Sequence, residues 1–354
     1  LITGGDGAHQ SRANSQTNTT HVIPRRDRGI QEKLASTLDP VVKPRGDDYP
    51  PLCNDYWTNS EKSFYLHANR IQHSHNHGSG CTLSSAIATC LALDYSLEDA
   101  LVIAKMYTTQ GIAQAQQYGK GPGPVEHLSW PQQQTYLPWI SVSDAPQRLT
   151  FPALTQKNMD IYPIVDNSQW LERLLPLGIN TIQLRIKDKP LDEIEQEIHR
   201  SVTIAQQYNA QFFINDHWRL AIKYKAYGVH LGQEDLLTAD FNAIHQAGLR
   251  LGISTHCYSE LARAHALQPS YIAFGPIYPT TSKEMRFAAQ GIEKLQTWRD
   301  TVDYPLVAIG GINHDNIKPI IRTGVNGIAM ISAITQAENP EAVVRQLYTH
   351  FTLV

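Results

Sequence analysis

The sequence predicts a closed (β/α)8 barrel in its second part, preceded by a smaller and partial domain. From residue 161 onward, short runs rich in Val and Ile alternate with amphipathic stretches. These runs lack apolar–polar alternation, so we expect strands buried on both faces, as in parallel sheets. Eight strand-then-helix units in under 200 residues favour a barrel over an open sheet. A doubly wound sheet, in which the first and eighth strands do not pair, is the alternative.

Each unit begins with a predicted strand that ends where polar residues or Gly interrupt the apolar run. The strands are expected at 161–166, 181–188, 211–216, 228–235, 250–256, 271–280, 305–312 and 327–334. The helices are expected at 170–178, 191–209, 217–227, 241–248, 259–268, 291–302, 315–324 and 339–351. Together they predict a barrel domain over residues 160–354.

The region before the barrel has a different character. The opening "LITGG" is typical of a buried strand that runs into a turn, so we expect the chain to begin inside a domain. A polar stretch without periodicity, at about residues 7–54, predicts a long loop or a disordered insert. Residues 81–118 predict a helical hairpin, which completes a first domain over 1–128. Many Pro, Gln and Ser residues predict a linker over 129–159.

Bulk properties exclude several classes of protein. A length of 354 residues suits about two domains, and the net charge of −3 argues against a nucleic-acid binder. No apolar run approaches the roughly 18 residues of a membrane span. The four cysteines show neither metal-site spacing nor a disulfide framework, which indicates a reducing, cytoplasmic location.

The predicted strands end in residues suited to phosphate chemistry, and the carboxyl ends of barrel strands form the active-site rim. Asp216 and Asp235 end neighbouring strands, and two carboxylates with few other acids suit Mg²⁺. Arg185, Lys187 and Lys283 are cations that suit a diphosphate. Backbone N–H groups at the ends of the last two strands suit a phosphate monoester. Two anion sites around one metal predict the joining of two phosphorylated molecules, with diphosphate as the leaving group.

Seven motifs support a more specific interpretation. "QLRIKD", "FIND", "GVHLGQED", "GISTH", "FGPIYPTTSK", "VAIGGI" and "MISAI" follow in this order across about residues 162–334. In this order they resemble the thiamine phosphate synthase family. The resemblance implies a Mg²⁺-dependent transferase that joins a hydroxymethylpyrimidine diphosphate to a thiazole-ethyl phosphate, giving thiamine phosphate and diphosphate. It implies a dissociative reaction in which the metal and the cations stabilise the departing diphosphate.

The resemblance also assigns residues to each ligand. Those implied to contact the pyrimidine diphosphate are Gln183, Leu184, Arg185, Ile186, Lys187 and Asn215. Asp216 and Asp235 are implied to bind Mg²⁺, and Ser254 and Lys283 to hold the diphosphate end. Those implied to receive the thiazole phosphate are Thr280, Thr281, Ser282, Gly311, Ile331 and Ser332. Ser282 replaces the family's usual Thr and keeps the hydroxyl, whereas "FAAQG" lacks the usual Pro.

The first domain carries motifs of another family. "HGSGCTLSSAIA", "AKMY" and "GKGPGPVEH" resemble the C-terminal part of hydroxymethylpyrimidine (phosphate) kinase, an α/β protein of the ribokinase-like fold. The resemblance implies an anion hole at Gly78, Ser79 and Gly80, with Cys81 as the base. The earlier half of that fold has no counterpart in the sequence. We therefore expect a truncated bifunctional kinase–synthase without kinase activity, and the sequence leaves nucleotide binding by this part open.

Other interpretations remain open at this point. The barrel is alternatively a non-catalytic sensor of thiazole phosphate or thiamine phosphate, or the chain acts mainly as a kinase. An Asp at a strand end is often a helix cap. His230 and His256 fit structural histidines better than acid–base groups, and alternating histidines in "HSHNH" are weak support for a metal site. The expected partners are small-molecule substrates, without nucleic acid or membrane, and homo-oligomers are an open question.

Overall fold

A computed structural model of the chain describes residues 2–3, 51–144, 148–280 and 287–351. The chain divides into two compact units. The first comprises Leu1–Ser129 and Tyr136–Pro146, and the second comprises Trp130–Thr135 and Gln147–Val354. The predicted polar insert lies mostly outside the described residues, although residues 52–54 belong to a strand of the first unit.

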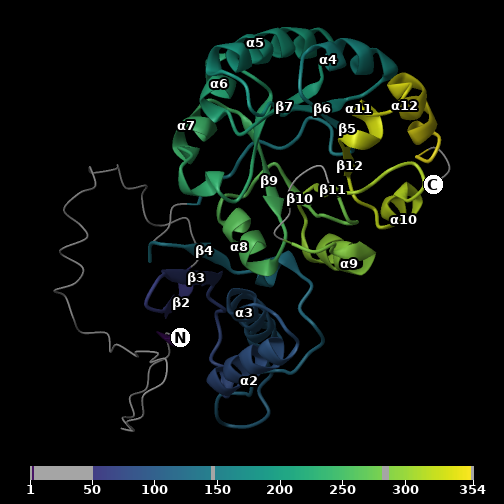
Figure 1. Ribbon diagram of the computed structural model, residues 1–354. Helices are drawn as coiled ribbons and strands as arrows, with labels where there is room; N and C mark the ends of the chain where they lie inside the picture. Colours follow the sequence, from purple (N-terminus) through teal and green to yellow (C-terminus); the bar gives the residue numbers. More distant parts are fainter. Residues whose placement is uncertain (1, 4–50, 145–147, 281–286, 352–354) are drawn as a thin grey trace. The chain divides into compact units, whose positions relative to one another are not determined.

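The second unit is a closed barrel of eight parallel strands, as the sequence predicted (Figure 1). The strands are β5 (Asp160–Val165), β6 (Thr181–Leu184), β7 (Gln211–Asn215), β8 (Gly228–Leu231), β9 (Arg250–Thr255), β10 (Tyr271–Phe274), β11 (Leu306–Ile309) and β12 (Gly327–Met330). They follow one another in sequence order around the barrel. β12 pairs with β5, with Ala329 opposite Tyr162. This pairing rules out the doubly wound alternative, which needs unpaired end strands.

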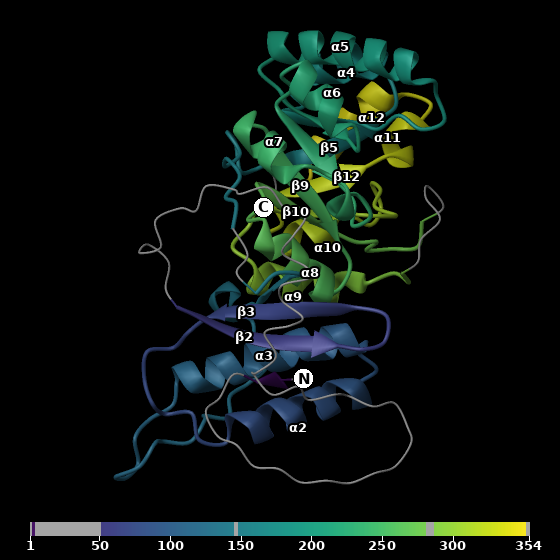
Figure 2. The same ribbon diagram turned by 90° about the vertical axis from the view of Figure 1, so that its left-hand side faces the viewer.

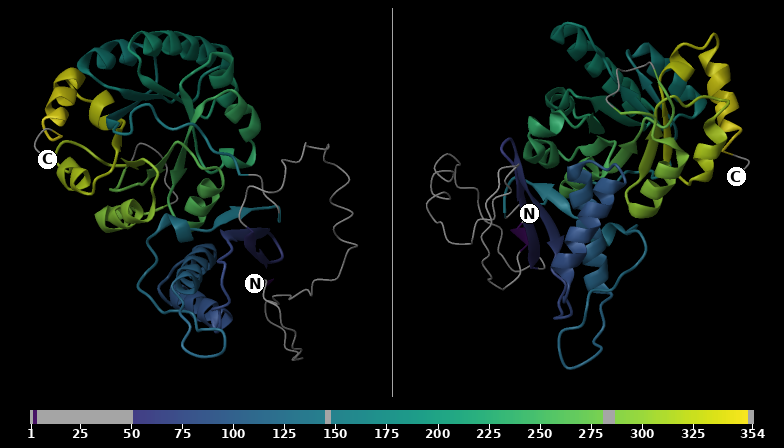
Figure 3. Two further views of the ribbon diagram at one scale, coloured as in Figure 1. Left: turned by 180° about the vertical axis from the view of Figure 1, so that it is seen from behind. Right: turned by 60° about the horizontal axis from the view of Figure 1, so that its bottom comes forward.

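Helices surround the barrel on its outside (Figures 1 and 3). They are α4 (Gln169–Leu174), α5 (Leu191–Gln207), α6 (Trp218–Lys223), α7 (Phe241–Gln246), α8 (Tyr258–Ala266), α9 (Gly291–Thr301), α10 (Ile317–Arg322), α11 (Ser332–Thr335) and α12 (Pro340–Tyr348), with the 3₁₀ turns η3 (Leu175–Leu177) and η4 (Asp235–Leu237). α5 shows how the pattern sets the packing. It buries Ile194, Ile198, Val202 and Ala205, whose spacing of three or four residues places them on one helix face.

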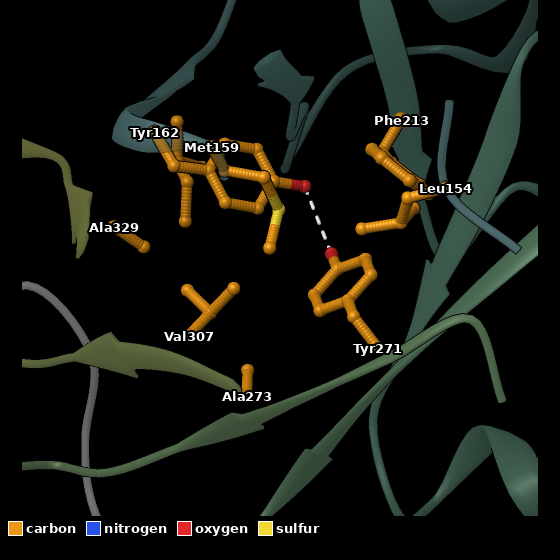
Figure 4. Close-up of a cluster of buried hydrophobic side chains, with 9 residues drawn as sticks. Leu154, Met159, Tyr162, Phe213, Tyr271, Ala273, Val307 and Ala329 are labelled. Carbon is orange, nitrogen blue, oxygen red and sulfur yellow. Dashed lines mark hydrogen bonds between the residues drawn. The ribbon is translucent and has the colours of Figure 1, made fainter. Parts of the chain in front are cut away.

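The barrel interior is filled by side chains at alternate strand positions. The buried cluster consists of Leu154, Met159, Tyr162, Ile164, Phe213, Tyr271, Ala273, Val307 and Ala329 (Figure 4). Two glycines make room for the large rings. A Cβ on Gly252 would lie 2.2 Å from Cζ of Tyr271, and a Cβ on Gly228 would lie 2.5 Å from Cε1 of Phe213. Glycines on β8 and β9 therefore permit aromatic rings on the neighbouring strands β7 and β10.

The first unit is a four-stranded antiparallel sheet with a helical hairpin. Its strands lie in the order β1 (Ile2–Thr3), β2 (Leu52–Thr58), β3 (Ser63–Asn69) and β4 (Trp139–Ser141). The predicted hairpin is confirmed as α2 (Ser79–Ala92) and α3 (Leu97–Ala113), which pack side by side (Figures 2 and 3). Lys105 on α3 reaches Asp55 on β2 at 2.7 Å, and both side chains are buried. This ion pair fixes the hairpin to the sheet.

Residues 129–159, where a linker was predicted, contain structure in both units. The 3₁₀ turn η2 (Gln134–Tyr136) and strand β4 lie in this stretch. Further along, the Phe151 N–H donates to the Gln268 carbonyl at 3.1 Å, and Leu154 and Met159 enter the barrel core. Within the described residues, no helix is long and apolar enough to cross a membrane.

Candidate active site at the carboxyl rim of the barrel

The two predicted metal-binding acids rise from neighbouring strands. β7 and β8 pair in parallel, so residues that follow them emerge at the same rim. Asp216 directly follows β7 with φ +64°, a left-handed conformation that Asp and Asn adopt more readily than most residues. The prediction that Asp235 ends its strand was wrong. β8 ends at Leu231, and Asp235 begins η4. The Gly232 N–H donates to its Oδ2 at 2.9 Å, which turns the carboxylate back toward the rim.

The charges of the two carboxylates act on one another at the rim. Burial raises the pKa of Asp235, and the neighbouring charge of Asp216 and a hydrogen bond with it raise the pKa further. The Gly232 N–H and the Lys187 ammonium act in the opposite direction. Lys187 Nζ lies 2.6 Å from Oδ2 of Asp216. The pair is therefore only partly neutralised by the protein's own cation.

The strand that carries the "QLRIK" segment is shorter than the predicted strand over residues 181–188. β6 ends at Leu184, so Lys187 lies beyond the strand, and its side chain is half exposed beside Asp216. Gln183 points into the barrel, where its amide donates to the Tyr162 hydroxyl at 3.0 Å. Leu184 and Ile186 are buried on the opposite parity, so their main chains are what they can offer a ligand. Arg185 is half-buried at the strand end.

Beneath the acids, a chain of hydrogen bonds crosses the barrel interior. The Gln183 amide meets Tyr162, whose hydroxyl lies 2.9 Å from that of Tyr271 (Figure 4). Tyr271 is 2.7 Å from Nδ1 of His230, and Nε2 of His230 is 2.8 Å from Oγ of Ser254. Neither tyrosine was predicted from the sequence. His230 was expected to be a structural histidine, and its ring does have a partner at each nitrogen. Burial raises the pKa of both phenols, so they stay protonated.

Other rim residues end or follow β7, β8 and β9. Asn215 ends β7 and is buried at 8% exposure. The Gln233 amide donates to the Ser254 carbonyl at 2.8 Å, while its own Oε1 is buried without a partner among the described residues. His256 Nδ1 lies 2.7 Å from Glu260 Oε2, and its ring stacks on Phe287. These contacts fit the structural interpretation of His256.

The far side of the rim is formed by the ends of β10, β11 and β12. Gly310 and Gly311 follow β11 with φ of +102° and +67°. A Cβ on Gly311 would lie 2.5 Å from the Pro279 carbonyl oxygen, so only glycine fits there. Ile331 precedes α11 and Ser332 begins it. Thr280 is the last described residue before a gap, and Thr281, Ser282 and Lys283 lie outside the described residues.

The first unit carries the residues of the predicted anion hole. Gly78 adopts a left-handed conformation with φ +83° and precedes α2, which begins at Ser79. Gly80 and Cys81 follow in the first turn and are exposed. In the "HSHNH" stretch, Nδ1 of His75 accepts a hydrogen bond from the Gly123 N–H at 3.0 Å. This histidine therefore fixes a loop of the first unit.

The fold and the polar rim define a TIM-barrel enzyme. Residues 155–334, half of the chain, match the family model described as thiamine monophosphate synthase. The chain belongs to this family. The prediction made from the motifs is confirmed, including the prediction that the chain is an enzyme.

Similar proteins agree with this assignment. A thiamine-phosphate synthase of Photorhabdus laumondii is 54% identical over 196 residues, which cover 55% of this chain and 91% of the relative. One from Proteus mirabilis is 52% identical over 196 residues, with the same coverage of 55% and 91%. The solved thiamine phosphate pyrophosphorylase from Pyrococcus furiosus superposes with a TM-score of 0.50 at 30% identity, covering 56% of this chain and 98% of that one.

The first unit has a separate match. Residues 30–126 match the family model described as phosphomethylpyrimidine kinase. This confirms the predicted order, in which a kinase-type segment precedes a synthase barrel.

Proposed function

We propose that the barrel joins hydroxymethylpyrimidine diphosphate to thiazole-ethyl phosphate in a Mg²⁺-dependent reaction that releases diphosphate. The observation that carries this proposal is the pair Asp216 and Asp235, which follow the neighbouring parallel strands β7 and β8. Burial of Asp235 and then its repulsion by Asp216 raise the pKa of Asp235. Carboxylates that repel one another at a rim with few other acids are suited to a divalent cation.

The donor set fits Mg²⁺ on chemical grounds. Mg²⁺ prefers oxygen ligands and usually keeps several waters, so one or two carboxylates and substrate phosphates suffice. Among the described residues, no group of three or more His, Cys, Asp or Glu side chains is arranged to hold a metal, which leaves the two acids as the protein's share. When bound, Mg²⁺ neutralises charge that develops on the leaving diphosphate. Asp216 and Asp235 would hold it.

Cationic side chains of the rim complete the diphosphate site in this proposal. Lys187 already lies 2.6 Å from Asp216, so a metal at the acids would be adjacent to its ammonium group. Arg185 has no acidic partner among the described residues, so its guanidinium is available to an anion. We assign to both the stabilisation of the departing diphosphate, together with Ser254. The same role for Lys283, outside the described residues, stays a prediction.

The pyrimidine and thiazole ends occupy different parts of the rim in this proposal. Gln183 and Asn215, with the main chain at Leu184 and Ile186, are assigned to the pyrimidine diphosphate. Main-chain N–H groups near Gly311, Ile331 and Ser332, with Thr280, are assigned to the thiazole phosphate. Thr281 and Ser282 are assigned to the same phosphate by resemblance alone. No side-chain nucleophile is required, since diphosphate departs from the methylene carbon attached to the pyrimidine and the thiazole nitrogen then attacks that carbon.

The direct test is an assay of thiamine phosphate from the two phosphorylated precursors. Product is expected with Mg²⁺ and is expected to disappear when a chelator removes the metal. Excess Mg²⁺ added after the chelator should restore activity. Product formation that is indifferent to chelator would reject the metal assignment. Binding of thiamine phosphate without any turnover, even with Mg²⁺, would favour the non-catalytic sensor.

The kinase-type unit requires its own assay. We propose that this 354-residue chain does not phosphorylate hydroxymethylpyrimidine, because its kinase-type motifs resemble only the C-terminal part of that family. The anion-hole role of Gly78, Ser79 and Gly80 and the base role of Cys81 stay predictions. ATP consumption that depends on hydroxymethylpyrimidine and is lost in Cys81→Ser would show that the unit is active.

The proposal extends to the setting of the reaction. A net charge of −3 and small phosphorylated substrates suit a cytoplasmic enzyme that needs neither nucleic acid nor membrane. Homo-oligomer formation is tested by light scattering at several protein concentrations.

A further inference from the structure

We propose that His230 is a positioning residue that fixes the direction of the Ser254 hydroxyl, so that this hydroxyl donates its proton to the diphosphate. The inference rests on the proposed function, which assigns Ser254 to the diphosphate. It adds a buried device below the rim that determines how this serine acts.

The His230 ring is held on three sides. Nδ1 lies 2.7 Å from the Tyr271 hydroxyl, and Nε2 lies 2.8 Å from Oγ of Ser254. The rings of His230 and Tyr271 also stack, with centroids 5.6 Å apart and planes inclined by 26°. His230 is 7% exposed, so water cannot easily replace these partners. Its imidazole therefore has a single orientation, with Nε2 toward the rim.

Glycine at position 252 permits this arrangement. Gly252 lies opposite His230 in the pairing of β8 with β9, and opposite Tyr271 in the pairing of β9 with β10. A Cβ at this position would lie 2.5 Å from the Tyr271 hydroxyl oxygen. The absence of a side chain at Gly252 thus lets the Tyr271 ring lie against β9, where its hydroxyl reaches His230.

The direction of this series of hydrogen bonds is argued from its end at Gln183. The Gln183 amide N–H donates to the Tyr162 oxygen. In the proposed arrangement, Tyr162 donates its own proton to Tyr271, and Tyr271 donates its proton to Nδ1 of His230. With Nδ1 accepting, the neutral imidazole carries its proton on Nε2 and donates to Oγ of Ser254.

This direction determines what Ser254 can do for a ligand. Because Oγ accepts from His230, its own proton is free to point away from the ring. The Gln233 amide fixes the adjacent main chain by donating to the Ser254 carbonyl at 2.8 Å. A hydroxyl that donates to a diphosphate oxygen forms a charge-assisted hydrogen bond, whereas one that donates to His230 would turn its lone pairs toward the anion. The buried hydrogen bonds thus make the Ser254 hydroxyl a hydrogen-bond donor to an anion.

The tautomer of His230 is the first test, and it needs no substitution at the site. Nitrogen-15 NMR of the histidine rings in the full chain at neutral pH distinguishes the two neutral tautomers. We expect the proton on Nε2 of His230, and a shift in its ring-nitrogen signals in Tyr271→Phe, which removes the donor to Nδ1. A proton on Nδ1 in the unsubstituted protein would overturn the proposal.

The second test is a double-mutant cycle that measures inorganic diphosphate binding by calorimetry in the presence of Mg²⁺. Ser254→Ala and His230→Leu are each expected to weaken binding about 10-fold, the loss of one hydrogen bond to a charged group. The double variant should bind no more weakly than Ser254→Ala alone. His230→Gln keeps an N–H near Nε2 and should recover most of the affinity. His245→Asn, a histidine that contacts the Thr150 carbonyl instead, is the matched control and should bind as the unsubstituted protein does.

The outcomes separate this inference from the proposed function. Additive losses in the cycle, or unchanged affinity in His230→Leu while Ser254→Ala binds weakly, would overturn the positioning role alone. Unchanged affinity in Ser254→Ala would reject the diphosphate assignment of Ser254 and the positioning role with it. Circular dichroism of each variant verifies that the barrel is folded.

Discussion

The Asp216→Asn substitution tests the metal site with little effect on the fold. Asn has the same shape as Asp and tolerates the left-handed backbone at this position, where φ is +64°. Ala at the same position would add about 1–2 kcal/mol of backbone strain and would mix a stability effect with a catalytic one. Asn therefore removes the charge and leaves the geometry.

The expected stability change is small. The substitution removes the ion pair with Lys187, whose side chain is 50% exposed, and such pairs contribute about 0.2–1 kcal/mol. It also relieves the repulsion between Asp216 and Asp235, which acts in the opposite direction. The net change in the free energy of unfolding should stay below about 1 kcal/mol, which shifts Tm by no more than about 2–4 °C for a domain of this size.

The expected change in activity is much larger. One of the two carboxylates proposed to hold the metal is lost, and kcat/KM should fall at least about 100-fold, which corresponds to about 2.7 kcal/mol of transition-state stabilisation. The Mg²⁺ concentration needed for half-maximal activity should rise as well. Both are measured by assaying thiamine phosphate across a Mg²⁺ titration.

A neighbouring acid provides the matched control. Asp188 is exposed, also has a positive φ of +58°, and has no assigned role. Asp188→Asn should retain the activity and Mg²⁺ dependence of the unsubstituted protein. If Asp216→Asn turned over within about twofold of that level, the two-carboxylate metal site would be refuted.

Three further predictions concern stability. The pKa of Asp235 lies above its ordinary 3.8, so the folded state binds this proton more tightly than the unfolded chain does. Without metal, the free energy of unfolding should therefore fall as pH rises through that pKa. Asp235→Asn should remove this fall in thermal unfolding with chelator, and an unchanged pH dependence of Tm would show that Asp235 is not its cause. Burial and then the charge of Arg148 lower the pKa of His265 from 6.5 to about 3. The free energy of unfolding should therefore fall as pH falls below about 6.5. A His265→Gln variant that kept this loss of stability would show that His265 is not its cause. Gly252→Ala places a Cβ 2.2 Å from Tyr271 and should destabilise the barrel by about 1–3 kcal/mol in denaturant unfolding. Gly119→Ala, which has open space around its Cβ, is the control and should not be destabilised. Equal stability of the two variants would show that the Tyr271 ring can move.

The sequence predicted the barrel because its strands are buried on both faces. Such strands appear as uninterrupted apolar runs, and their polar ends mark the rim, which is how Asp216 was found. The same property hides the interior. When both parities of a strand are apolar, the pattern does not show which residues point inward, so Tyr162 and Tyr271 resembled ordinary core aromatics. Their hydroxyls meet across strands that are 109 residues apart in sequence, and no local pattern encodes that contact.

Strand ends and the first unit were less predictable. The apolar character of "TIQLRI" continues past the last paired residue, Leu184, so the pattern overestimated β6. In the first unit, β2 and β3 form a hairpin around a turn in which Asn59 accepts hydrogen bonds from the N–H groups of Glu61 and Lys62. That turn and the flanking aromatic residues were a usable signal for a hairpin.

The structure argues against the helix-cap interpretation of the two acids. A helix cap requires the side chain to accept an N–H of the following first turn. The helix after Asp216, α6, begins at Trp218, and its N-cap residue is His217, without a side-chain cap hydrogen bond. Asp216 contacts Lys187 instead. Asp235 accepts from Gly232, which precedes it, so it caps no following turn either. Burial and then the charge of Asp216 raise the pKa of Asp235, an electrostatic cost that a helix-cap role leaves unexplained. The cation proposed above would remove that cost.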